Sequence, residues 1–325
     1  MIHGVCLNVP VKWIIVVICI LTPLAVQGQQ DAQFTQYMYN GLFFNPANAG
    51  KEAGHSITAL HRSQWLSYST ATGAGGAPTT QLITVSSAFE KTNLGVGLTV
   101  VNDNIGAFNN QEVNLALAYH LRMGRGRLSL GASGGFFSST IDYGSLEAVN
   151  PDPIIGSDGK ENQINNSISF GLIYDRSNFY AGASIRHFNE PSFDLGEGFE
   201  NKLENHHYVV VGYRINTFAL FSVEPSILLK SISLNNFSYD VSVIGTYNKR
   251  MSAGLAYRGD ESASILMGYS LLKDNSLRLG YAFDLVVGGL EAKSPTTHEF
   301  MLSYNIPQAK KELERVIQRT PRFRF

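Results

Sequence analysis

Short segments of alternating apolar and polar residues run along the chain from Ser56 to Asn305. Between Val113 and Tyr119, for example, every second residue is apolar or aromatic, and the segment from Leu277 to Phe283 repeats this pattern. Successive side chains of a β-strand point to opposite faces, so this spacing places the apolar side chains on one face. The pattern predicts an all-β chain.

The same pattern predicts fourteen strands, one of them interrupted by Pro225, which cannot donate a ladder hydrogen bond. The strands are expected at residues 56–62, 79–90, 94–102, 110–121, 127–138, 165–174, 179–188, 206–213, 219–231, 236–247, 251–258, 262–271, 276–284 and 297–305.

The connections between these strands are alternately short and long. Tight polar turns, such as 91–93 and 175–178, alternate with longer stretches, such as 139–164 and 189–205. Outer-membrane barrels have this asymmetry, with the short turns on the periplasmic side. We therefore expect a transmembrane antiparallel β-barrel over residues 56–306, in the outer membrane of a Gram-negative bacterium, with both termini periplasmic.

A soluble β-sandwich also uses alternating strands, so further features must distinguish the two folds. Aromatic residues such as Tyr119 and Tyr304 stand at strand ends, where an interfacial girdle requires them. Small residues such as Gly95 and Gly97 recur on the face opposite the apolar one, which suits a curved wall or a crowded lumen. Both features favour the barrel.

Residues 1–28 are predicted to be a secretory signal peptide, because Lys12 precedes an apolar run from Trp13 to Val26. This run is shorter than the roughly 20 residues of a membrane-spanning helix, which disfavours a retained anchor. The two cysteines of the chain, Cys6 and Cys19, both lie in this segment. The mature chain is therefore expected to have no disulfide and no thiolate metal site, although Cys19 leaves a lipoprotein site as an alternative.

A barrel of fourteen strands has a lumen wider than its own wall side chains fill, so a plug or a conducting pore is expected. Three segments are candidates for the plug, namely 67–78, 139–164 and 29–51. We interpret residues 29–55 as an N-terminal periplasmic or plug-like segment. Its aromatic residues lack the alternation of a lipid-facing strand and must be buried elsewhere.

A tail of residues 307–325 follows the last strand, which Pro307 ends. From Gln308 onward the tail has six basic and two acidic residues, a net charge of +4. A solvated terminus is one interpretation. The other is a periplasmic tail that binds a partner through charge and aromatic anchors, with these candidate contacts: Arg319, Pro321, Arg322, Phe323 and Phe325.

A second candidate partner-binding site lies at the end of the first strand, at Arg62, Gln64 and Trp65. Tryptophan and arginine are enriched in binding hot spots. Membership of the aromatic girdle explains Trp65 equally well.

The N-terminal segment carries a recognisable pattern, Gln-Phe-x-Gln-Tyr-Met-x-Asn-x-x-x-x-Asn-Pro-Ala-x-Ala-Gly, over residues 33–50. It resembles the opening signature of the PorP/SprF family of Bacteroidota outer-membrane proteins. Further blocks that resemble the family follow in the expected order at 62–65, 76–81, 94–97, 102–106, 179–184, 207–208, 225–230 and 298–302. Family members often end on Ser-Pro-Arg-aromatic, whereas this chain has Thr320-Pro321-Arg322-Phe323 followed by Arg324-Phe325.

The resemblance implies a component of the type IX secretion system that supports the secretion and surface anchoring of a large adhesin-like protein, including gliding adhesins. It also implies two kinds of partner besides outer-membrane lipids. One is a secreted adhesin-like protein with a type IX sorting domain, and the other is a periplasmic lipoprotein or peptidoglycan-binding component.

No catalytic or metal site is expected from the residue pattern. His206 and His207 are adjacent, so on a strand they face opposite sides and cannot bind one ion. Asp152, Asp158 and Glu161 lack the spacing of a calcium loop. No nucleophile elbow, phosphate loop or dinucleotide fingerprint is present, and the net charge of −1 argues against nucleic acid. We predict a non-enzymatic protein without a cofactor.

Two functional hypotheses remain. The first is the non-enzymatic secretion component that the resemblance implies. The second is an outer-membrane channel for small solutes, which predicts an open lumen and a dispensable tail.

Overall fold

The computed structural model describes residues 31–66, 68, 76–145, 159–194, 200–218, 220–234, 236–272, 274–288 and 294–306. The predicted signal peptide and the predicted tail 307–325 lie outside these residues. The predicted periplasmic position of the two ends concerns residues before Asp31 and after Ile306, and therefore also lies outside them. Among the described residues, no helix is both long and apolar enough to cross a membrane.

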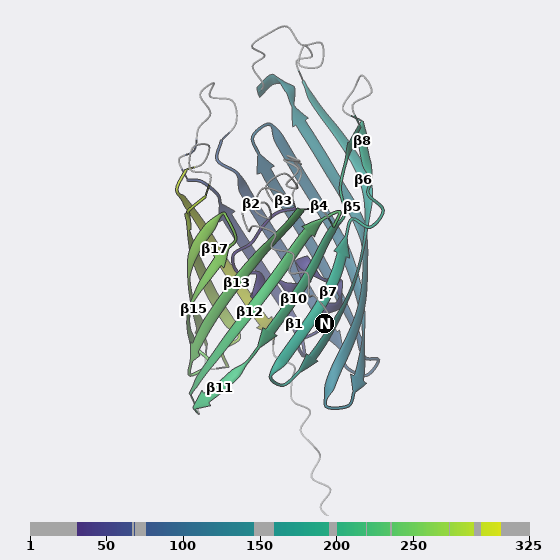
Figure 1. Cartoon of the computed structure of the whole chain (residues 1–325). Coiled ribbons are helices and arrows are strands. Elements are labelled where there is room, and N and C mark those ends of the chain that lie inside the picture. The colour runs from purple at the N-terminus through teal and green to yellow at the C-terminus, as the bar shows by residue number, and fades with distance from the viewer. Residues whose placement is uncertain are drawn as a thin grey trace, which may run out of the picture. The chain divides into compact units, whose positions relative to one another are not determined.

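The described chain forms a closed antiparallel barrel (Figure 1). Its sheet has fifteen strands, of which β10 and β11 occupy one position in turn beside β12, so the wall has fourteen positions. The first strand pairs with the last, and β10 pairs with β12, which closes the ring. This confirms the predicted fold class and strand number.

The wall strands have these bounds: β1 His55–Ser63, β2 Thr79–Phe89, β3 Leu94–Ile105, β4 Phe108–Met123, β5 Gly126–Asp142, β6 Lys160–Arg176, β7 Phe179–Arg186, β10 His206–Tyr213, β11 Ile215–Phe218, β12 Phe221–Ile232, β13 Asn236–Tyr247, β14 Met251–Arg258, β15 Ser262–Leu271, β16 Leu277–Val286 and β17 Thr296–Ile306. A separate two-stranded hairpin consists of β8 Ser192–Asp194 and β9 Glu200–Lys202, within the connection from β7 to β10.

Strands β5 and β6 extend furthest beyond the bounds that the sequence pattern predicts. Both β5 and β6 extend beyond the predicted 127–138 and 165–174, and Figure 1 shows them rising at the end where β8 lies. Beyond the outward Ile164, the outward side chains of this extension are polar, and Asn162 donates hydrogen bonds to Ser138 and Thr140 across the pair. Apolar alternation therefore ends before the strands do.

Pro225 lies where β12 changes its partner. On one side β10 pairs with β12 up to Ser226, and the short β11 takes over at Val223, while β13 pairs continuously on the other side. The missing N–H of proline therefore falls at a gap in the ladder. The predicted strand 219–231 corresponds to β12. The short β11 precedes it, because β12 changes its partner at Pro225.

Apolar side chains cover the outer face of the wall. Leu115, Leu117 and Leu255, for instance, are each more than half exposed. The inner face carries small and polar residues instead, such as Thr84, Ser169 and Ser242, which are buried. An apolar exterior around a polar interior is the reverse of a water-soluble protein and is the arrangement of a barrel in lipid.

Candidate functional site

The chain between Asp31 and Gly50 lies inside the barrel, and we call this segment the plug. It contains three short helical turns, η1 Tyr37–Tyr39, α2 Gly41–Phe44 and η2 Pro46–Asn48. Proline at the first position suits the start of such a turn, and the Asn45 side chain accepts a hydrogen bond from the Ala47 N–H at 2.9 Å. Turns of this kind fold the segment compactly enough to fit the lumen.

An aromatic cluster fastens the plug to the inner wall. The rings of Phe34, Phe43 and Phe44 contact one another edge to face, and Phe44 also contacts Tyr208 of β10 at a centroid distance of 5.3 Å. Aliphatic wall residues complete this core: Leu60, Leu82, Val101, Leu228 and Met301. The expectation that these aromatics are buried away from the lipid-facing wall is confirmed. Of the three candidate plug segments, the N-terminal one lies in the lumen, while residues 67, 69–75 and 146–158 of the others lie outside the described chain.

Inward glycines let the plug approach the wall backbone. A Cβ built on Gly95 would lie 2.0 Å from the carbonyl oxygen of Ala49, and one on Gly280 would lie 2.2 Å from Oε1 of Gln36. Neither wall position could carry a larger side chain with the plug in this place. The small residues opposite the apolar face therefore leave the space that the plug occupies, in agreement with the crowded lumen expected from the sequence.

Glu299 on β17 holds the plug at one side of the lumen. Its two carboxylate oxygens accept hydrogen bonds from the backbone N–H groups of Thr35 and Gln36, at 2.8 and 2.9 Å. Arg62 lies 3.1 Å from the same carboxylate and 2.9 Å from Asp284. Glu299 is 0% and Arg62 2% exposed, so these ionic bonds are made away from water. Removing one partner of such a buried set typically costs about 3–5 kcal/mol.

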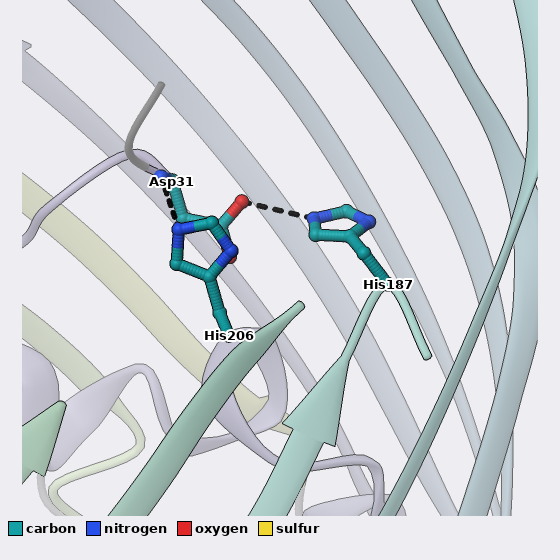
Figure 2. Close-up of side chains that lie close together, drawn as sticks. All are labelled: Asp31, His187 and His206. Carbon is teal, nitrogen blue, oxygen red and sulfur yellow. Dashed lines mark hydrogen bonds and ion pairs between the residues drawn. The ribbon is translucent and has the colours of Figure 1, made fainter. Parts of the chain in front are cut away.

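Asp31 holds the plug at a different part of the wall, beside the ends of β7 and β10. Its carboxylate lies 2.6 Å from Nη1 of Arg186 and 2.9 Å from Nε2 of His187, and its backbone N–H donates to Nε2 of His206 at 3.2 Å. Figure 2 shows dashed lines from Asp31 to both histidine rings. Burial alone would raise the pKa of this carboxyl, but Arg186, His206 and His187 hold the pKa of Asp31 well below its usual value.

The three side chains in Figure 2 are also the types that bind metals, and their ligand atoms lie within 4.8 Å of one another. However, their atoms are already engaged. The ring nitrogens that face Asp31 bind Asp31 itself, since His187 Nε2 lies 2.9 Å from its carboxylate and His206 Nε2 accepts from its backbone N–H at 3.2 Å. The two Nδ1 atoms bind Ser167 and the Glu204 carbonyl oxygen. Arg186 also places a positive charge on the same carboxylate, which disfavours a divalent cation there. The arrangement fits a hydrogen-bonded fastening better than a metal centre.

Between these two fastenings, Gln33 contacts a third charged group. Its Oε1 accepts a hydrogen bond from Lys230 at 3.1 Å, and Lys230 also lies 2.9 Å from Asp240. Arg258 bonds the other oxygen of Asp240 at 2.8 Å. Residues 31–36 are therefore fastened to three neighbouring wall strands, β7, β10 and β12, and to β17, which β13, β14, β15 and β16 separate from β12.

The second half of the plug contacts strand backbones. The Asn45 amide donates to the carbonyl oxygens of Leu172 and Ala183, at 3.1 and 3.0 Å, which belong to the paired strands β6 and β7. His120 on β4 contacts the Ala49 carbonyl oxygen at 3.0 Å. The Asn-Pro-Ala block of the sequence pattern is therefore a docking element between plug and wall.

The predicted partner-binding residues of the first strand have separate positions. Arg62 points into the lumen and bonds the carboxylates described above, not the outer surface. Gln64 and Trp65 follow the strand end and are half-buried. The Trp65 backbone N–H donates to Thr297 at 3.0 Å, and its ring lies 5.9 Å from that of Tyr68. Binding of a partner by Gln64 and Trp65 stays a prediction, and the tail residues 319–325 lie outside the described chain.

The fastening residues Asp31, Arg186 and Glu299 were not identified from the sequence. A usable signal was present, because Arg186 and Glu299 are single charged residues on the inward-facing positions of strands whose other inward residues are uncharged. A charge at such a position must have a partner inside the barrel.

Comparisons with known proteins agree with this architecture. Residues 26–304 match the family of the type IX secretion system membrane protein PorP/SprF. No curated protein sequence matches the chain.

Solved structures with a similar trace are outer-membrane barrels of very different sequence. Omp33 of Acinetobacter baumannii is 9% identical, with a TM-score of 0.46, and the match covers 79% of this chain and 100% of Omp33. A FadL homologue of Pseudomonas aeruginosa is 11% identical, with a TM-score of 0.45 and coverage of 80% and 92%. A mutant of the monoaromatic hydrocarbon channel TodX is 11% identical, with a TM-score of 0.48 and coverage of 81% and 93%.

Because the family match spans most of the chain and includes both the plug and the barrel, this outer-membrane β-barrel belongs to the PorP/SprF family of type IX secretion system membrane proteins.

Proposed function

We propose that this barrel is a non-conducting, non-enzymatic component of the type IX secretion system that supports the secretion and cell-surface anchoring of a large adhesin-like protein. Membership of the PorP/SprF family supports the link to secretion. The observation that carries the rest is the plug, which crosses the lumen with bonds to several wall strands.

The plug argues against a channel for small solutes. Its core consists of buried aromatic rings in contact with wall residues, and its backbone touches the inward glycines. A solute could pass only if this core opened, at the cost of the buried apolar and ionic contacts. The barrel is therefore a rigid body on which partners assemble.

The ends of the barrel suit two different partners. The long connections, which include the β8–β9 hairpin, are proposed to face outward toward the secreted adhesin. The short turns and the end of β17 at Ile306 are proposed to face the periplasm. There the basic tail 307–325 would bind a periplasmic lipoprotein or peptidoglycan-binding component, through Arg319, Arg322 and Phe323 among others.

Truncation of residues 308–325 tests this function. Surface display of the partner adhesin is measured in cells whose barrel level in the outer membrane equals that of the parent. We expect display to fall strongly, because the tail supplies the periplasmic contact. Unchanged display would refute the role of the tail.

Two double variants distinguish the contribution of the aromatic side chains of the tail from that of its positive charge. Phe323→Ala with Phe325→Ala removes the aromatic anchors, while Lys310→Gln with Lys311→Gln removes charge nearer the barrel. We expect the first pair to reduce display more than the second. Measurement of the purified parent barrel in a planar bilayer tests the alternative, because steady ion conductance would favour the solute channel.

A further inference from the structure

A cavity of about 560 Å³ lies against the plug at the short-turn end of the barrel, and we call it the vestibule. Its inner end is formed by plug residues such as Tyr39 and Leu42. Its outer rim includes Lys249 and Asn275, which belong to turns between wall strands. The vestibule is a closed-ended space that opens away from the long connections.

Positive charges exceed negative ones around the vestibule. Five basic side chains line it, namely Lys51, Arg127, Arg214, Lys249 and Arg278, against the acidic Glu52, Asp175 and Glu224.

Two of the basic residues are paired with carboxylates, whereas the acidic Glu52 has no basic partner within 4.0 Å in the part of the chain that the structure describes. Lys51 lies 3.0 Å from Asp175, and Arg214 lies 2.8 Å from Glu224. Among the described residues, the other three basic side chains have no carboxylate partner within 4.0 Å. Arg127 donates to the Lys51 carbonyl oxygen, and Arg278 donates to Tyr39 and Ser252, all of which are uncharged acceptors. Three cations without a carboxylate partner against the single carboxylate of Glu52 leave the vestibule with a positive excess, and a cleft with an excess of one sign attracts ligands of the opposite sign.

The three unneutralised cations lie at different parts of the wall. Arg127 is the second residue of β5, Arg278 lies on β16, and Lys249 lies between β13 and β14. In the sheet order, β5 is separated from β16 by β4, β3, β2, β1 and β17. One small anion cannot contact charges spread around the ring in this way, whereas an extended chain with several carboxylates can.

The lining also contains the groups that suit a peptide backbone. Its lining includes hydroxyl and amide side chains, such as Ser270 and Asn305, and apolar side chains, such as Val210 and Met301. The chain's own tail has the wrong sign, because its net charge is +4. We propose that the vestibule receives an acidic peptide segment of a periplasmic partner. This proposal rests on the proposed function, since it names the chemistry of the partner that binds the short-turn end.

Fluorescence anisotropy with the purified full-length barrel tests the proposal. The probe is a short labelled peptide of alternating Glu and Ala, and the comparison peptide has Gln in place of Glu. We expect the acidic peptide to bind and the Gln peptide to bind at least tenfold more weakly. Equal binding of the two peptides would overturn the proposal.

Matched variants locate the site. Lys249→Gln and Arg127→Gln remove cations that line the vestibule, and Lys91→Gln and Arg125→Gln remove cations from exposed turns that do not line it. We expect the first two variants to weaken peptide binding about tenfold each and the other two to leave it unchanged. Lys249→Arg, which keeps the charge, should restore binding. Equal weakening by all four Gln variants would overturn the proposal, because it would show attraction to general surface charge.

Two further readouts separate the alternatives. Inorganic phosphate that displaces the peptide at low millimolar concentration would identify a small-anion site and overturn the peptide assignment. Because the binding assay needs no secretion, its result is independent of the tail truncation. A barrel that fails to bind the peptide but requires its tail for adhesin display would refute the vestibule proposal alone.

Discussion

Gly131 of β5 lies directly against Ala47 of the plug, so close that an added Cβ would stand 2.3 Å from the Ala47 backbone nitrogen. Such a contact is shorter than any non-bonded approach that the backbone tolerates, so either the wall or the plug must move when the side chain grows.

The substitution Gly131→Ala is therefore expected to displace the plug without unfolding the barrel. Overpacking of this kind costs about 1–3 kcal/mol, and we expect faster amide hydrogen exchange in residues 31–50 together with unchanged exchange in the wall strands. The control is Gly134→Ala on the same strand, where an added Cβ meets nothing within 4 Å. Equal exchange in both variants would contradict the close fit of plug and wall.

Substitution of the carboxylate that holds Thr35 and Gln36 is the second test. Glu299→Gln removes the charge that Arg62 neutralises and leaves one acceptor for two backbone N–H groups. We expect a loss of about 3 kcal/mol in plug stability, observed as transient opening events in planar bilayers. Glu90→Gln, in an exposed turn, removes the same charge outside the lumen and should stay closed. A Glu299→Gln barrel as silent as the parent would show that the plug does not depend on this bond.

The aromatic cluster gives a third test that involves no charge. Phe34 is 1% exposed and packs between Phe43 and Phe44. Phe34→Ala should cost about 3–5 kcal/mol, measured as the free energy of plug opening from hydrogen exchange. The outward Phe136→Ala, on the lipid-facing side of β5, is the control and should leave plug exchange unchanged. Comparable exchange in the two variants would mean that the cluster contributes little to plug stability.

The strand pattern was predictable because every wall strand has one face in lipid and the other in a polar lumen. The alternation of apolar and polar residues therefore predicted the number of strands and their order. It failed beyond Ser138 and before Ile164, where outward residues such as Thr140 and Asn162 are polar and the apolar signal stops although pairing continues.

The plug and its fastenings were less accessible to sequence reasoning. The aromatic residues within 34–44 had to be buried, but the sequence offered three candidate segments for the lumen. The wall glycines fit the N-terminal segment closely, and this fit is visible only in the three-dimensional structure. His187 and His206 come together only because the connection between β7 and β10 returns to the same end of the barrel. Asp31 joins them from a distant part of the sequence.

Chelation provides a test of the description of the Asp31 cluster as a hydrogen-bonded fastening. We expect EDTA treatment of the purified barrel to leave plug exchange unchanged, because the ring nitrogens of His187 and His206 already have protein partners. Elemental analysis should find less than one zinc per barrel after dialysis. One tightly held zinc that is lost in a His187→Gln variant would contradict this description.

The pH dependence of the closed state follows from the same cluster. Because the folded pKa of Asp31 lies well below its ordinary value of about 3.8, Asp31 stabilises the plug fully above that ordinary value, and the stabilisation is lost only as pH falls through the lower, folded value. Between pH 5 and pH 8 we therefore expect no Asp31-dependent change in conductance, and opening should begin only well below pH 4. Asp31→Asn, which cannot ionise, should open more readily than the parent at neutral pH and should resemble it in strong acid. A parent barrel that opens near pH 6 would show that protonation of a different group controls the plug.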